Sequence, residues 1–145
     1  MKHIVIINGP NLNLTGRREP SIYGSETMED YLGRLRQLYP EIEISYYQSN
    51  VEGELINKLH AVGFEAVGIV LNAGGYSHTS VALHDAIAAI SAPVVEVHIS
   101  NIHAREAYRR ISLLSEVCEG VICGMGMDGY RYAVDYLIHK GEVGK

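Results

Sequence analysis

Three short stretches of the chain carry polar side chains that could act together on a small molecule. The first, residues 8–24, contains asparagines, arginines and a tyrosine; the second contains Asn72 and His78; the third contains Glu96 and His98. Histidine exchanges a proton near neutral pH, arginine keeps its positive charge, and a tyrosine beside a cation can act as a base. This set of side chains suits proton transfer on a small, oxygen-rich anion.

The segments between these stretches alternate between strand-like and helix-like patterns. Short runs rich in Val and Ile predict strands, and apolar residues three and four positions apart predict helices. Thr27 is the expected N-cap of the first helix, and Pro40 follows its end. The strands are predicted at 4–7, 41–48, 66–71, 94–99 and 120–123, and the helices at 28–38, 54–62, 79–90, roughly 104–114 and 127–140.

This alternation predicts an α/β fold built from five βα units. Continuous apolar strands imply a parallel sheet that is covered by helices on both faces. Right-handed crossovers then give a flavodoxin-like, doubly wound, five-stranded parallel sheet in a three-layer α/β/α sandwich. A length of 145 residues suits a single catalytic domain spanning 1–145.

The predicted topology places the three polar stretches at one edge of the sheet, because ligands bind beyond the carboxyl ends of parallel strands. Residues 9–26 are aperiodic and longer than a usual connection between a strand and a helix. We interpret them as a lid loop, in which residues 8–13 form a fixed floor and residues 17–23 a mobile cover. The lid would close over a substrate held by the other strand ends.

Composition excludes several partners and compartments. The net charge of -5, from 12 basic and 17 acidic side chains, disfavours nucleic acid or an anionic membrane as a partner. No stretch approaches the ~20 apolar residues that span a bilayer, and no signal peptide is recognisable. Cys118 and Cys123 flank one predicted strand, so we expect no disulfide scaffold and a cytoplasmic location.

The sequence disfavours three other kinds of chemistry. The G-x-G-x-x-G pattern at 124–129 follows a strand, but too few residues remain to complete a dinucleotide-binding unit. We interpret these glycines as close packing between strand and helix. No zinc-binding spacing occurs around the cysteines or histidines. The chain's lysines lie near its ends or on a polar helix face, which disfavours a covalent imine route: Lys2, Lys58, Lys140 and Lys145.

The polar stretches resemble the type II 3-dehydroquinate dehydratase family. The resemblance rests on NGPNLNLTGRREPSIYG at 8–24, LNAGGYSHTS at 71–80 and EVHISNIHAR at 96–105, in the family's order and spacing. It implies a lyase that dehydrates 3-dehydroquinate to 3-dehydroshikimate through an enolate, in the shikimate pathway, without metal or cofactor. It also implies a homo-oligomer, a dodecamer of four trimers. Thr15 and Val51 depart from the residues that the family often has at these positions.

The resemblance implies that Tyr23 is the general base and that Arg18 stabilises its phenolate. His98 would be the general acid, oriented by Glu96 two residues earlier on the same strand face. Each assignment has an alternative. Tyr23 could simply pack as a flap with Arg18 in solvent, and His98 could be a structural histidine. For the whole chain, the alternative is a non-catalytic flavodoxin-like binding or scaffold domain.

The other implied site residues bind substrate or shape the pocket. Backbone N–H groups of Ile99 and Ser100 would hold the substrate carboxylate, as donors at a turn after a strand can. Arg109 would hold a ring hydroxyl, and Asp85 would reach the site of a neighbouring subunit; each could instead be a solvated helix charge. Asn11 would shape the pocket or hold a water, unless it is only a turn residue. The remaining implied substrate contacts are Asn72 and His78.

Overall fold

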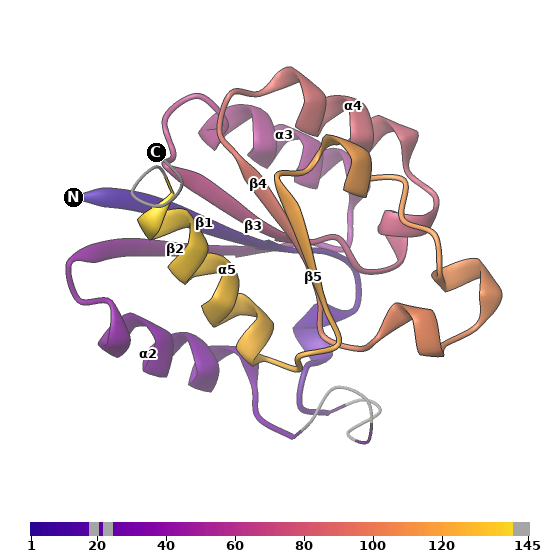
Figure 1. Ribbon diagram of the computed structural model, residues 1–145, viewed down its shortest axis with the longest axis horizontal. Helices are drawn as coiled ribbons and strands as arrows, with labels where there is room; N and C mark the ends of the chain where they lie inside the picture. Colours follow the sequence, from indigo (N-terminus) through magenta and orange to yellow (C-terminus); the bar gives the residue numbers. More distant parts are fainter. Residues whose placement is uncertain (18–20, 22–24, 141–145) are drawn as a thin grey trace.

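A five-stranded parallel sheet forms the centre of the molecule (Figure 1). The computed structural model describes residues 1–17, 21 and 25–140. The strand order is β2-β1-β3-β4-β5, and every pair is parallel. This is the flavodoxin-like order that the sequence predicts. The strands are β1 (Lys2–Asn8), β2 (Ile42–Gln48), β3 (Gly68–Asn72), β4 (Val94–His98) and β5 (Gly120–Cys123).

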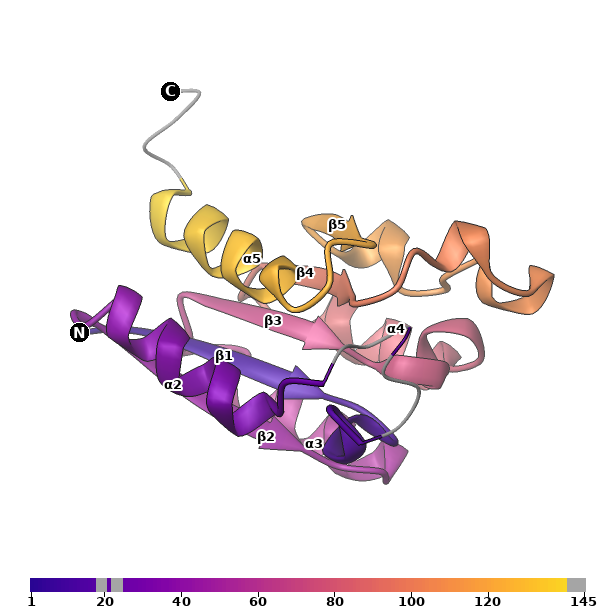
Figure 2. The ribbon, with the colours of Figure 1, turned by 90° about the horizontal axis from the view of Figure 1, so that it is seen from below.

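Two pairs of α-helices cover the two faces of the sheet, which confirms the three-layer sandwich. In Figure 2, α2 (Met28–Leu38) and α5 (Asp128–His139) lie on the near face. The opposite face carries α3 (Glu52–Val62) and α4 (Val81–Ala89). None of these helices in the described part of the chain is long and apolar enough to cross a membrane.

The core consists of two apolar layers that the central strands divide between them. Along β1, Ile4 and Ile6 pack with α2 and α5, whereas Val5 and Ile7 pack with α3 and α4. All four side chains are fully buried. Alternate residues of a strand point to opposite faces, so a strand buried on both faces must be apolar throughout.

Side-chain caps fix the starts of two helices, and the sequence predicted the first of these caps. The Thr27 side chain accepts a hydrogen bond from the Asp30 N–H at 3.2 Å, and α2 has the bounds predicted from the sequence. Ser80 caps α4 in the same way through the Leu83 N–H at 2.9 Å. The helix α3 begins two residues before its prediction, and Val51, its N-cap residue, makes no side-chain cap.

The predicted helix at 104–114 is wrong. The chain between β4 and β5 instead forms three short 3-10 helices, η3 (Ile102–Ala104), η4 (Ala107–Arg109) and η5 (Ser115–Val117). The backbone leaves helical geometry at Arg105 (φ -111°, ψ -166°) and Glu106 (φ -59°, ψ 150°). The fourth of the five expected βα units therefore lacks its α-helix.

Tertiary hydrogen bonds explain why this helix does not form. The Leu113 N–H donates to the Ser77 carbonyl at 2.8 Å, and His78 Nδ1 lies 2.8 Å from the Ile111 carbonyl. A continuous helix over 104–114 would instead pair the Leu113 N–H internally, with the carbonyl of Arg109. Two apolar residues of the segment, Tyr108 and Ile111, are also 67% and 71% exposed, so the segment does not bury a continuous apolar face.

Candidate active site

A polar cavity of about 180 Å³ lies at the carboxyl ends of β1, β3 and β4. This is the edge at which strand topology predicts that the three polar stretches meet. Seven of the predicted site residues line it, and they come from all three stretches and from the segment after β4: Asn11, Asn72, His78, His98, Ile99, Ser100 and Arg109.

The remaining predicted site residues lie elsewhere. Glu96 lies behind His98, on the same strand. Asp85 lies on α4 outside the cavity lining, where its carboxylate is 2.9 Å from His84 Nδ1 and its side chain is 71% exposed. Arg18 and Tyr23 lie outside the described residues.

A larger surface groove of about 660 Å³ runs along α5 near the end of α2. Its ionisable side chains pair with nearby residues. Tyr39 donates to Asp135 at 3.1 Å, and Glu119 binds both Tyr136 at 2.7 Å and Lys140 at 3.4 Å. The groove contains none of the predicted site residues, so we locate the active site in the smaller cavity.

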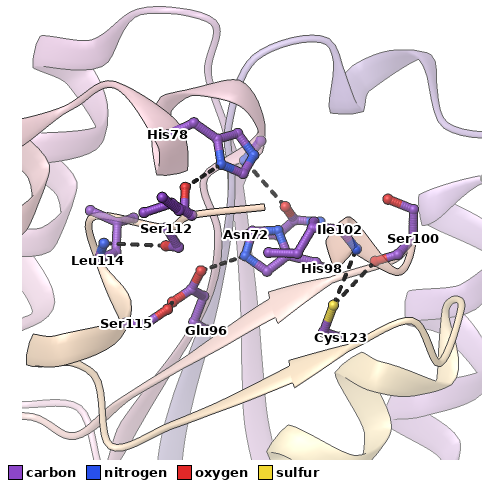
Figure 3. A network of polar contacts seen from close by, with 12 residues as sticks. Asn72, His78, Glu96, His98, Ser100, Ile102, Ser112, Leu114, Ser115 and Cys123 are labelled. Atoms are coloured by element: carbon purple, nitrogen blue, oxygen red, sulfur yellow. Dashed lines mark hydrogen bonds and ion pairs between the residues drawn. The ribbon is translucent and has the colours of Figure 1, made fainter. Parts of the chain in front are cut away.

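Glu96 and His98 form a buried pair at the inner wall of the cavity (Figure 3). The two side chains are 0% and 5% exposed, and His98 Nε2 is hydrogen-bonded to Glu96 Oε2. The second carboxylate oxygen, Oε1, accepts from the Ser115 hydroxyl at 2.6 Å. Burial alone would raise the pKa of Glu96, but hydrogen bonds from His98, Ser115 and Ser112 hold that pKa below its ordinary value.

The charge on Glu96 assigns the roles of the two ring nitrogens of His98. An ionised carboxylate only accepts hydrogen bonds, so Nε2 of His98 must carry a hydrogen. Nδ1 is then the nitrogen that gains or loses a proton. This arrangement resembles other sites in which a carboxylate orients a histidine for proton transfer.

His78 faces His98 across the cavity, with ring centroids 6.1 Å apart and planes inclined by 26°. Its Nδ1 lies 2.8 Å from the Ile111 carbonyl, and a carbonyl can only accept. Nδ1 therefore carries a hydrogen, and Nε2 of the neutral ring is an acceptor. A hydroxyl group of a ligand is a suitable donor to that nitrogen.

The floor of the cavity is held by contacts at the ends of β1 and β3. The Gly9 N–H donates to the Asn72 carbonyl at 2.7 Å, and a Cβ on Gly9 would lie 2.4 Å from the Ala73 carbonyl oxygen. Asn11 adopts a left-handed conformation (φ 70°), and its N–H donates to Asn50 Oδ1 at 3.0 Å. These contacts fix the part of residues 8–13 that lines the cavity.

A second polar network fixes the amide of Asn72. Its Nδ2 donates to the Tyr130 hydroxyl at 2.9 Å, and its Oδ1 accepts from the Gly74 N–H at 3.2 Å. The Tyr130 hydroxyl in turn donates to Asn8 Oδ1 at 2.8 Å. Tyr130 is fully buried on α5, and the sequence analysis did not identify it as part of the site.

Arg105 lines the cavity but was not predicted as a site residue. Its Nη1 donates to the Ser100 hydroxyl at 3.3 Å, at the turn that follows β4. Arg109 lies on η4, where a hydrogen bond to Glu106 at 3.1 Å raises the pKa of its guanidinium. The signal for Arg105 was present, because this residue ends the third stretch of resemblance at 96–105.

The cavity thus combines two arginines, two facing imidazoles and fixed amides. This set can bind an anionic, hydroxylated ligand and exchange protons with it. Within the part of the chain that the structure describes, no group of three His, Cys, Asp or Glu side chains is arranged to hold a metal ion.

Comparison with known proteins gives consistent matches over nearly the whole chain. The family model described as dehydroquinase class II matches residues 2–138. A 3-dehydroquinate dehydratase of Bacillus licheniformis is 50% identical over 144 residues, covering 98% of this chain and 99% of the relative. One of Actinobacillus pleuropneumoniae is 49% identical over 142 residues, covering 97% and 92%. A crystal structure of a type II dehydroquinase from Butyrivibrio crossotus has a TM-score of 0.91 at 44% identity, covering 94% and 97%.

Proposed function

Because the chain belongs to the class II dehydroquinase family, we propose that it dehydrates 3-dehydroquinate to 3-dehydroshikimate with a tyrosine base and a histidine acid. The chain is a 3-dehydroquinate dehydratase, since about half of its residues are identical to those of enzymes with that name over nearly the full length. The alternative of a non-catalytic binding or scaffold domain is therefore not supported. The shikimate pathway is the setting that this reaction implies.

The geometry that carries the proposal is the buried pair of Glu96 and His98 at the wall of a polar cavity. Nδ1 of the His98 imidazolium would give its proton to the departing hydroxyl, so that the carbon–oxygen bond breaks and water leaves. The pair of electrons for the new double bond comes from an enolate. The Glu96 carboxylate, whose pKa is held below its ordinary value, would accept from Nε2 and so leave Nδ1 as the nitrogen that delivers the proton.

Tyr23 would form that enolate by taking the proton from the carbon beside the ketone. Arg18 would lower the pKa of the phenol through its fixed positive charge. These two assignments rest on the sequence motif at 8–24. Each turnover leaves a proton on Tyr23 and removes one from His98, so exchange with solvent must reset both groups.

The other cavity residues would orient the substrate. We assign the substrate carboxylate to the turn after β4, where backbone N–H groups of Ile99 and Ser100 and the Ser100 hydroxyl are available. His78 and Arg109 would bind ring hydroxyls, with His78 using Nε2 as acceptor. Asn72 would contact the substrate, and Asn11 would lie near the enolate oxygen or hold a water there.

Direct assay tests this function. The purified protein incubated with 3-dehydroquinate is expected to produce the absorbance of a conjugated enone, at a rate that borohydride does not change. A reaction without protein provides the background. Absence of the enone would refute the proposed reaction, whereas inactivation by borohydride would show an imine on a lysine and refute the enolate route through Tyr23.

We further propose that residues 1–145 act as one catalytic domain in the cytoplasm and assemble as a dodecamer of four trimers. The exposed position of Asp85 on α4 is compatible with a reach into a neighbouring subunit's site. Light scattering is expected to give about twelve times the 16.0 kDa chain mass. A stable, fully active monomer would contradict both the assembly and the role of Asp85.

A further inference from the structure

The carboxylate of Glu96 has a second partner that the proposed mechanism does not use. While Oε2 binds the ring of His98, Oε1 accepts a hydrogen bond from the Ser115 hydroxyl at 2.6 Å (Figure 3). Glu96 is fully buried, so neither oxygen can turn to bulk water for a replacement donor. A buried carboxylate that loses a donor is destabilised in its charged form.

Contacts on both sides of η5 fix the position of Ser115. Before it, Leu114 is fully buried, and its N–H donates to the Ser112 hydroxyl at 3.2 Å. After it, the Glu119 N–H donates to the Val94 carbonyl at 2.7 Å and joins the segment to β4. The segment between β4 and β5, where a helix was predicted, therefore places the Ser115 hydroxyl against the carboxylate of the Glu96–His98 pair, on the side away from the His98 ring.

We propose that Ser115 is a positioning residue for His98, acting through the carboxylate of Glu96. This inference rests on the proposed role of His98 as the acid. The Ser115 hydroxyl anchors one carboxylate oxygen so that the other is held against Nε2, and the ring then keeps its mobile proton on Nδ1. Outer hydrogen-bond partners of this kind orient a histidine in many catalytic and metal sites.

Several other groups face the pair. The His78 ring stacks on His98, and Arg105 and Arg109 line the same cavity. The Cys118 thiol lies near the charge of Glu96. Burial raises the pKa of this thiol most, the negative charge of Glu96 raises it further, and together they bring it to about 12. Cys118 is therefore neutral at neutral pH and does not compete for the proton on the pair.

The direction of the pH effect follows from the charges. At high pH the imidazole is neutral, and the Glu96 carboxylate then depends more on its hydroxyl donors, Ser115 first and Ser112 after it. Removing that hydroxyl destabilises this deprotonated state more than the state with an imidazolium beside the carboxylate. The Glu96–His98 pair then loses its proton at higher pH. In a fraction of the molecules that proton lies on Glu96 instead of on Nδ1 of His98.

Replacement of Ser115 by alanine tests the proposal. Ser115→Ala is expected to lower kcat about 10-fold with little change in KM, and to move the basic limb of the kcat profile about 0.5–1 unit to higher pH. Ser115→Thr keeps the hydroxyl and should restore both values. Ser91→Ala is the matched control, because the Ser91 hydroxyl donates to the Gly63 carbonyl at 3.3 Å in the turn before β4 and lies outside the cavity lining.

A measurement that needs no turnover separates this proposal from the catalytic one. In protein with 13C-labelled histidine rings, the His98 signal, identified by its loss in His98→Gln, should titrate at higher pH in Ser115→Ala. If that shift occurs while His98→Gln retains turnover, the acid assignment fails and the positioning role stands. The positioning role would be overturned if folded Ser115→Ala had the kcat, the pH profile and the His98 titration of the wild-type protein. Should alanine prevent folding, Ser115→Cys, a weak donor of similar size, should give an intermediate shift.

Discussion

Replacing His98 by glutamine is expected to lower kcat for 3-dehydroquinate about 10³-fold, with KM changed only a few-fold. General acid catalysis contributes roughly 10²–10⁴-fold, and glutamine has no group that can donate a proton to a departing hydroxyl at neutral pH. Its amide can still donate to Glu96, so the buried carboxylate is not left without a partner. The loss should therefore report the missing proton and not a collapse of the site.

The initial rate of enone formation measures this effect, and circular dichroism checks that the variant is folded. His60→Gln is the matched control, because His60 is exposed on α3 and lies outside the cavity lining. The control should keep the wild-type rate. If His98→Gln retained more than about a tenth of the wild-type kcat, His98 would be a structural histidine and the acid would have to be sought elsewhere in the cavity.

Local sequence patterns predicted most of the fold because local interactions decide most of it. The start of α2 follows from a threonine cap and an apolar stripe, and the structure places both as expected. The helix prediction for residues 104–114 was wrong for a physical reason. The apolar spacing of this segment suits a helix, but hydrogen bonds from Leu113 to Ser77 and from His78 to Ile111 hold the backbone in another course. Such contacts leave no periodic trace in the sequence.

The same distinction applies to the site. Strand order alone brings Asn72, His78 and His98 to one edge, so their convergence could be predicted. The partners that orient them could not. Ser115 is 19 positions from the carboxylate that it binds, and Tyr130 is 58 positions from Asn72. The sequence identifies residues that carry chemistry, whereas only the packed structure identifies the residues that hold them in place.

The second large effect is expected at Tyr23. Tyr23→Phe should lower kcat by about 10³-fold or more, because it removes the proposed base and keeps the ring that would pack in a flap. Enone formation again measures the rate. Tyr132→Phe is the matched control, since Tyr132 is partly exposed on α5 and its ring contacts Arg131 away from the cavity.

Arg18, the proposed partner of Tyr23, gives an independent test in which the direction of the pH shift is predicted. A guanidinium beside a phenol favours the phenolate, so Arg18→Gln should move the acid limb of the kcat profile to higher pH. Activity should then recover in part as the pH is raised, which Tyr23→Phe cannot do. If Tyr23 only packs as a flap, phenylalanine should keep near-normal turnover and Arg18→Gln should leave the acid limb in place. The two variants together therefore separate a catalytic phenolate from a structural lid residue.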